Sequence, residues 1–301
     1  MSNLLHPALF RRLDRRLDRC LDRRLDRRVH RRLPCRLSVA GLFACLLIQS
    51  AAAQTVVRSN GTGSDTGGML RLAQAFMQAH PNVKVEVQPA LGSSGGISAL
   101  IAGQIELAVS NRPPRDSELA RLPMQSTEYA RTPVVIAVGR DLGVTALTST
   151  QLAALCAEGA ATYPNGQRAR PVLRLSDAGA TELLKSFSPE VATAVDAASK
   201  RRGMLNANTD SEAADLVEHT AGAFALSTLA LIDSEKRPLT ALAIDRRVPT
   251  VANLLDGSYP FYKSLWMVVA SNATAQTKLF AGFVQSAPGQ AVLRAHGHAP
   301  R

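Results

Sequence analysis

Residues 61–68 read GTGSDTGG and residues 92–96 read GSSGG, and these two short stretches decide the fold. Each follows a strand-like run, at residues 54–58 and 83–88, and each leads into an amphipathic, helix-like run. A loop of Gly, Ser and Thr that leads into a helix presents backbone N–H groups, hydroxyls and the positive end of the helix dipole. Two such loops lying side by side predict a pocket for a small anion.

Two further polar stretches follow strand-like runs. Residues 110–113 read SNRP and place a hydroxyl, an amide and a guanidinium after the short run at residues 106–109. Residues 174–181 read RLSDAGAT and open another helix-like run, where Asp177 alone would be an ordinary N-cap and Arg174 alone an ordinary surface charge. Together they repeat the order of strand, polar loop and helix. The carboxyl end of a strand is the usual ligand-binding edge in open α/β sheets, so a second lobe could close there over the same anion.

The charge of the chain is concentrated at its N-terminus. The 301 residues carry a formal net charge of +11, but residues 1–53 contain 12 Arg and 4 Asp, whereas the rest contains 23 basic and 20 acidic residues. The basic surface of a nucleic-acid-binding protein is therefore absent beyond residue 53, and we expect no nucleic-acid partner. With 46% apolar residues, the chain is long enough for one large globular domain or two small ones.

Residues 31–53 have the organisation of a signal peptide. A basic segment precedes the apolar run at residues 37–48, and small residues ending at Ala53 form a cleavage site. The apolar run is too short for a stable membrane span, so we expect cleavage near Ala53 and an exported protein without stable membrane insertion. A lipoprotein-like sequence ending at Cys45 leaves lipidation there as an alternative.

Residues 11–34 repeat a tetrad of the form RRLD. One interpretation is a basic helical arm for nucleic acid or anionic lipid. The other is an unstructured expansion before the signal peptide, or a wrongly assigned start site. A period of four makes the leucines spiral around a helix instead of forming one stripe. We favour the second interpretation, because a strong export signal follows the repeat. Cys156 is the only cysteine beyond the signal peptide, and we expect it to be a buried apolar residue without a disulfide partner.

Beyond residue 53, strand-like and helix-like runs alternate, which is typical of α/β layers with mostly parallel strands. The strand-like runs are residues 54–58, 83–88, 106–109, 133–138, 172–175, 223–226, 239–244 and 265–270. The helix-like runs include residues 69–79, 97–102, 149–157, 178–186, 211–219 and 273–284. A break near residues 129–133 divides the series, and the run after it begins a second series.

Two enzymatic interpretations fit less well. The GSSGG stretch matches the G-x-S-x-G elbow of hydrolases, with Ser94 as nucleophile, but only His219 follows it with a suitable order in the chain. We expect His296 and His298 to lie in a frayed C-terminal tail. Residues 61–67 weakly match a dinucleotide-binding loop, with Glu86 at the distance of a ribose-binding acid. We expect no cofactor, and no metal-binding pattern is present in the sequence.

The order and spacing of four stretches resemble those of the periplasmic phosphate-binding proteins of bacterial ABC importers. These stretches are GSDT at residues 63–66, GSSGGI at 92–97, SNRP at 110–113 and GAFA at 222–225. The resemblance covers nearly all of residues 54–300. It implies an α/β, two-lobed type II periplasmic-binding-protein fold, with mixed, mostly parallel sheets and a ligand cleft between the lobes. The implied divisions are 1–53 as the repeat and signal peptide, 54–132 with 248–301 as lobe 1, and 133–247 as lobe 2. The chain would cross near residues 132–134 and again between residues 239 and 259.

The resemblance also implies ligand-binding residues. Ser64, Thr66 and Ser93 would bind oxyanion oxygens through hydroxyls and backbone N–H groups, and Arg174 and Thr181 would contribute from the second lobe. The full predicted set is Ser64, Asp65, Thr66, Ser93, Ser94, Asn111, Arg112, Arg174, Ser176 and Thr181.

The chain departs from the family pattern at two of these positions. Where many members carry an Asp that accepts the proton of hydrogen phosphate, this chain has Asn111, so discrimination against sulfate is in doubt unless Asp65 replaces that Asp. The second-lobe loop reads Gly179-Ala180-Thr181 where the family has Ser-Gly-Thr, so one hydroxyl donor is missing.

The function implied by the resemblance is binding without catalysis. We expect a monomeric periplasmic protein that captures a small oxyanion, most simply phosphate, and delivers it to an ABC permease at the inner membrane. The alternative is a diverged binding, sensor or envelope accessory protein of the same fold that has no transport role.

Overall fold

A computed structural model describes residues 55–157, 159, 161–174 and 178–301, so the predicted signal peptide, the Arg-rich repeat, Cys45 and Ser176 lie outside the described residues. The strands are β1 (Thr55–Gly61), β2 (Val83–Val87), β3 (Leu107–Ser110), β4 (Met124–Gly139), β5 (Ala146–Leu147), β6 (Arg170–Leu173), β7 (Leu205–Asn206), β8 (Ala223–Thr228), β9 (Leu239–Ile244), β10 (Tyr262–Ala270) and β11 (Ala299–Pro300). The helices are η2 (Gly63–Asp65), α1 (Thr66–Ala79), α2 (Gly92–Ile101), α3 (Asp116–Leu119), η3 (Arg140–Leu142), α4 (Ser149–Ala157), α5 (Ala178–Lys185), α6 (Pro189–Ser199), α7 (Asp210–His219), α8 (Leu229–Glu235), α9 (Val251–Leu255), α10 (Ala275–Gln285) and α11 (Ala287–Arg294).

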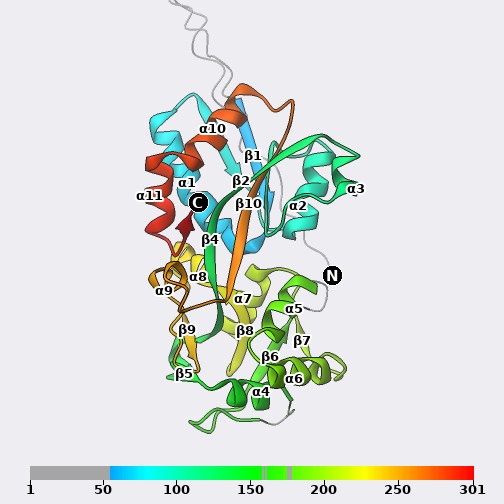
Figure 1. The fold of residues 1–301 in the computed structure, drawn as a ribbon, viewed down its shortest axis with the longest axis vertical. Helices are drawn as coiled ribbons and strands as arrows, with labels where there is room; N and C mark the ends of the chain where they lie inside the picture. The colour runs from blue at the N-terminus through cyan, green and yellow to red at the C-terminus, as the bar shows by residue number, and fades with distance from the viewer. Residues whose placement is uncertain (1–54, 158, 160, 175–177) are drawn as a thin grey trace, which may run out of the picture. The chain divides into compact units, whose positions relative to one another are not determined.

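The strands form a mixed sheet in the order β2-β1-β3-β10-β4-β8-β6-β7. Strands β1, β2 and β3 pair in parallel, as do β6, β7 and β8, and every antiparallel pairing between two of the strands named above involves β4 or β10. We call β1–β3, β10 and β11 with the first half of β4 lobe 1, and β5–β9 with the second half of β4 lobe 2 (Figure 1). The predicted α/β, two-lobed fold class is confirmed.

Strand β4 runs through both lobes, so the predicted break at residues 129–133 is wrong. The first half of β4 pairs with β10, up to Pro133 opposite Tyr262, and from Val134 onward β4 pairs with β8. Strands β10 and β8 supply backbone hydrogen-bond partners to successive parts of β4, so the chain needs no turn at Pro133. The exact lobe boundaries at residues 132 and 247 stay a prediction.

Each lobe has its own apolar core. Helix α1 places Met69, Leu72, Ala73 and Phe76 on one face at helical spacing, and this face packs against buried residues of β1, β3 and β10 in lobe 1. In lobe 2, α4 and α6 cover one face of the sheet, while α7 and α8 cover the other. Cys156 is buried in the first of these layers, as predicted, and it is a free cysteine.

The glycine-rich stretches are more helical than expected. Residues 92–96 are the first turn of α2, and residues 66–68 are the first turn of α1. Helices α6, α8 and α11 were not predicted, and the expected frayed tail is wrong, because His298 is fully buried. A hydrogen bond from His298 to Asp65, 233 residues earlier, fixes the C-terminus against lobe 1.

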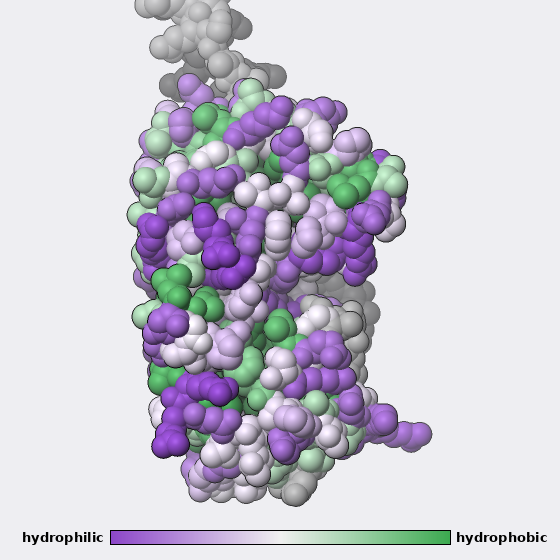
Figure 2. Space-filling model, in the orientation of Figure 1, coloured by the Kyte–Doolittle hydropathy of each residue, from purple (hydrophilic) through white to green (hydrophobic). Residues whose placement is uncertain are grey.

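The face shown in Figure 2 is mostly hydrophilic, with apolar residues in separate patches. Such a mixture is usual where a protein surface meets water. Over the described part of the chain, no helix combines the length and the apolar character needed to cross a membrane.

We expect the lobe 1 core to depend strongly on Phe76. This fully buried ring contacts Phe280 and Phe283 with centroid distances of 5.1 and 5.5 Å. Phe76→Ala leaves a cavity and should lower the free energy of unfolding by about 3–5 kcal/mol in urea denaturation. Leu255→Ala removes a side chain that is 68% exposed and should change the free energy of unfolding by less than about 0.5 kcal/mol. Equal losses in both variants would contradict the assigned core.

Candidate functional site

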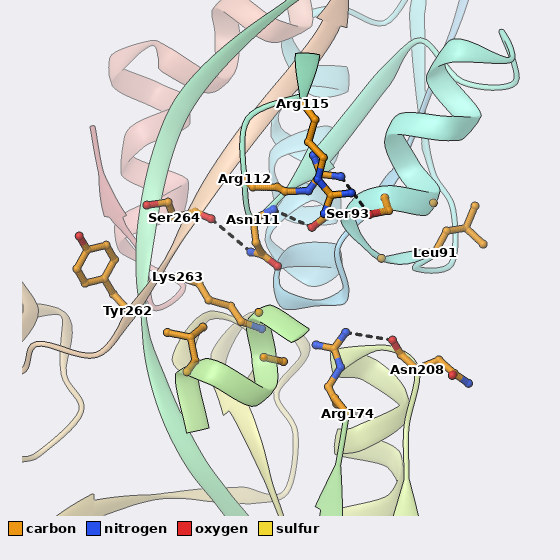
Figure 3. Close-up of a pocket in the computed structure, with 16 residues that line it drawn as sticks. Leu91, Ser93, Asn111, Arg112, Arg115, Arg174, Asn208, Tyr262, Lys263 and Ser264 are labelled. Atoms are coloured by element: carbon orange, nitrogen blue, oxygen red, sulfur yellow. Dashed lines mark hydrogen bonds between the residues drawn. The ribbon is translucent and has the colours of Figure 1, made fainter. Parts of the chain in front are cut away.

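A pocket of about 900 Å³ lies where the two lobes meet. It opens at the carboxyl ends of β3 and β6, which is the edge predicted to bind a ligand. Its lining residues are Leu91, Gly92, Ser93, Ser94, Gly95, Asn111, Arg112, Arg115, Arg174, Gly179, Ala180, Leu183, Asn208, Tyr262, Lys263 and Ser264 (Figure 3). This volume lies within the usual range for small-molecule sites.

Five of the predicted site residues line this pocket: Ser93, Ser94, Asn111, Arg112 and Arg174. Ser64, Asp65, Thr66 and Thr181 are described but do not line it. Thr66 and Thr181 contact the backbone instead, since their hydroxyls donate to the carbonyls of Thr62 and Arg174 at 3.5 and 3.1 Å.

The lobe 1 wall is organised by Ser93 and Asn111. The backbone N–H of Asn111 donates to Ser93 Oγ at 2.9 Å, so the Ser93 hydroxyl uses a lone pair there and can point its hydrogen into the pocket. The Asn111 amide donates to the carbonyl of Ser264 at 3.3 Å and accepts from Thr62 Oγ1 at 2.6 Å. Asn111 therefore joins three segments of lobe 1.

Arg112 is held by an internal partner. Its guanidinium donates to both carboxylate oxygens of Glu118, at 2.7 and 2.8 Å, and to Ser94 Oγ at 3.0 Å. Hydrogen bonding from Arg112 is the main reason that the pKa of Glu118 is lowered. The pair is bidentate, which is a strong geometry for these two groups, and it neutralises the charge of Arg112 at the pocket wall.

The floor of the pocket holds two buried cations that share one carboxylate. Arg174 is 6% exposed and donates to Asp210 Oδ1 at 2.6 Å, and Lys263 is 5% exposed and donates to the same oxygen at 2.8 Å. Ser64 Oγ donates to Asp210 Oδ2 at 2.6 Å. Burial raises the pKa of Asp210, but Lys263 and Arg174 outweigh this effect and keep it well below its usual range. With Asp210 ionised, the group of three charges carries a net charge of +1.

The stretch at residues 61–68 packs inside the protein and does not line the pocket. Asp65 is fully buried and points toward Tyr129 and His298: the Tyr129 hydroxyl donates to Asp65 Oδ2, and His298 Nε2 lies 2.7 Å from Oδ1. Burial raises the pKa of Tyr129 well above its ordinary value, so this hydroxyl stays protonated. Burial lowers the pKa of His298, but the charge and hydrogen bond of Asp65 raise it, and the net direction is upward.

The sequence interpretation missed Lys263 and Asp210. Lys263 had a detectable signal, because it occupies a buried position of β10 in alternation with Leu265 and Met267, where an unpaired cation would be costly. Asp210 had none, since an acid in the first turn of a helix is common.

Ser94 accepts from Arg112, and no His is among the described residues that line the pocket. Within the same described part of the chain, no group of three His, Cys, Asp or Glu side chains is arranged to hold a metal ion.

The chain matches the family model of the PBP superfamily domain over residues 49–288. It belongs to the PBP superfamily. No curated protein sequence matches the chain.

Solved structures with the same fold come from several bacteria. A Clostridium perfringens protein, assigned as a phosphate ABC transporter substrate-binding protein and solved with bound phosphate, is 20% identical with a TM-score of 0.66; the match covers 82% of this chain and 100% of that one. An ABC-type phosphate transport receptor from Vibrio cholerae is 24% identical with a TM-score of 0.54, over 82% and 100%. Peb3 from Campylobacter jejuni is 12% identical with a TM-score of 0.53, over 81% and 100%. At these identities the likeness establishes the fold alone.

The buried pair of His298 and Asp65 should make stability depend on pH. Because the folded pKa of His298 is raised, its contribution is fully present below the unfolded pKa of about 6.5 and is lost as the pH rises through the folded pKa. His298→Asn should therefore cost about 3 kcal/mol of unfolding free energy in acid, and less in base. Urea denaturation between about pH 5 and pH 9 measures this difference.

The matched control is His219→Asn, because His219 is exposed and contacts only a nearby carbonyl in the described structure. It should leave the pH profile unchanged. A cost of His298→Asn that stayed constant across the pH range would show that the ring acts through packing and not through its charge.

Proposed function

We propose that this protein is an exported solute-binding protein that captures a small oxyanion, with phosphate as the leading candidate, and delivers it to an ABC permease. The single observation that carries the proposal is the charge at the pocket floor. Arg174 and Lys263 both donate to one oxygen of Asp210, and none of the described lining residues is acidic. An anion at this point is favoured because it would lie beside two buried cations that water reaches poorly.

Three further observations support an oxyanion. The hydroxyls of Ser93 and Ser94 lie at the first turn of α2, a helix of 10 residues whose N-terminus faces the pocket together with Gly92. Hydroxyls and N–H groups at a helix start complement the oxygens of a tetrahedral anion. Similar solved structures include substrate-binding proteins of phosphate ABC transporters, one of them with bound phosphate.

The mechanism requires binding and release, with no bond made or broken. In this proposal the anion lies between the α2 wall of lobe 1 and Arg174 of lobe 2, so that contacts from both lobes favour a closed form. The closed form would then dock on the permease. Export would be to the periplasm, with the signal peptide removed near Ala53 and the mature protein acting as a monomer.

Two observations favour a second candidate, a diverged sensor or accessory protein of the same fold. The stretch at residues 61–68 does not line the pocket, and Arg112 is neutralised by Glu118, so fewer donors face a ligand than the resemblance implies. A ligand-dependent partner other than a permease would distinguish this candidate from transport.

Calorimetric titration of the mature protein with phosphate and with sulfate tests the proposal. Because Asn111 offers no carboxylate to accept a ligand proton, we expect both anions to bind, with less than about a tenfold preference for phosphate. Absence of heat and of any thermal shift with either anion would exclude an oxyanion ligand.

Ser93→Ala tests the predicted binding wall. Loss of one hydroxyl donor should weaken phosphate binding by about 1–1.5 kcal/mol, or roughly tenfold, in the same titration. Ser98→Ala is the matched control, because Ser98 lies on α2 but is exposed outside the pocket lining, and its affinity should equal that of the wild type. Equal affinity of both variants for phosphate would show that the ligand does not bind at the α2 wall.

A further inference from the structure

The carboxylate of Asp210 lies where donors from three separate segments converge. Ser64 from η2 donates to one of its oxygens, and Arg174, which follows β6, and Lys263 from β10 donate to the other, all at 2.6–2.8 Å. Lys263 Nζ also lies 3.2 Å from Ser64 Oγ, so the three donors surround one small volume. A hydroxyl, a guanidinium and an ammonium aimed at one point form the kind of donor set that binds an oxyanion.

The anion in this donor set belongs to the protein itself. Ser64 is part of the stretch at residues 61–68, whose composition indicates anion binding, and its hydroxyl is buried and occupied by Asp210. Arg174 and Lys263 also line the pocket, whereas Asp210 does not. The two cations are thus shared between an internal carboxylate and whatever anion enters the pocket.

Helix α7 is built to bring Asp210 to this position. A Cβ on Gly63 would lie 2.8 Å from Ser211 Oγ and 2.9 Å from its backbone nitrogen, so only glycine lets the start of α7 approach η2 this closely. The ordinary explanation of a first-turn acid is its interaction with the helix dipole. Glu212 meets that need from an exposed position, whereas Asp210 is 1% exposed and pairs across the lobes, so the dipole does not account for it.

We propose that Asp210 is a built-in competitor of the ligand: it occupies the inner part of the oxyanion site and limits how tightly the pocket holds small inorganic oxyanions. The inference rests on the proposed function in one respect, namely that the ligand of this pocket is an oxyanion. A phosphate or sulfate ion approaching Arg174 and Lys263 meets donors that are already partly neutralised. Removing the internal carboxylate should open the inner position to the external ion.

Asp210→Ala is the decisive variant. It leaves a carboxylate-sized space beside two buried cations, so the melting temperature should fall by on the order of 10 °C in anion-free buffer. Inorganic phosphate or sulfate at about 10 mM should restore most of this loss, because an external ion fills the vacated position. The same variant should bind phosphate at least about tenfold more tightly than the wild type in calorimetry.

Asp196→Ala is the matched control. It removes the same charge from the same lobe, but Asp196 lies on α6, is 59% exposed and pairs with Lys185. Its melting temperature should respond to phosphate and sulfate as the wild type does. A second test adds Lys263→Met to Asp210→Ala, which removes one of the two cations and should abolish the rescue.

The proposal is supported if phosphate or sulfate restores the melting temperature only in variants that lack Asp210 and keep Lys263. An equal response of Asp210→Ala and Asp196→Ala to anions would overturn it and leave Asp210 as a structural ion pair. If Asp210→Ala does not fold without anions, its refolding yield is measured with and without sulfate. A higher yield with sulfate supports the proposal, and an unchanged yield contradicts it. Wild-type protein that binds phosphate while Asp210→Ala shows no rescue contradicts this inference alone. If the wild-type protein binds no anion but anions restore the melting temperature of Asp210→Ala, the result contradicts the proposed function alone.

Discussion

Two buried cations donate to one carboxylate where the two lobes meet, and the packing of the site depends on this contact. Arg174 and Lys263 are nearly inaccessible, and burying each charge costs free energy unless an acid compensates it. Asp210 compensates one charge and orients both side chains. Both cations line the pocket, and Lys263 of lobe 1 reaches Asp210 of lobe 2. One ionic contact therefore joins the two lobes and sets the charge at the pocket floor.

The glycines at residues 61–68 show that a sequence motif can correctly predict a close contact with the backbone without identifying the group that makes it. Glycine allows close approach to the backbone, which suggests a phosphate group. In this protein the close partners are other parts of the chain: the start of α7 at Gly63, Ser234 and Glu235 of α8 at Gly67, and the buried Asp65 and His298 at Gly68. The same lack of a Cβ serves both purposes, so composition alone cannot distinguish a ligand from a neighbouring helix.

Sequence periodicity predicts the layers of this fold well, because each amphipathic run reflects one buried face. Strand β9 and helix α4 have the predicted bounds, and β10 and α10 differ from them by a few residues. The convergence at Asp210 could not be predicted in this way. Asp210 lies 146 positions after Ser64 and 53 positions before Lys263, and no local sequence pattern encodes such distant pairs. The predicted break near residues 129–133 is wrong for the same reason, since only the distant partners of β4 show that the strand continues.

The hydroxyl of Ser64 links the inner carboxylate to the pocket wall. It has one hydrogen and lies 2.6 Å from Asp210 Oδ2 but 3.2 Å from Asn111 Oδ1, so it donates to Asp210 in this structure. The amide oxygen of Asn111 accepts from Thr62 Oγ1 at 2.6 Å. Asn111 also holds Ser264 and, through its own N–H, Ser93. The Ser64 hydroxyl therefore lies between Asp210 of lobe 2 and the Asn111 side chain that holds the α2 wall, so one residue of lobe 1 contacts both parts of the site.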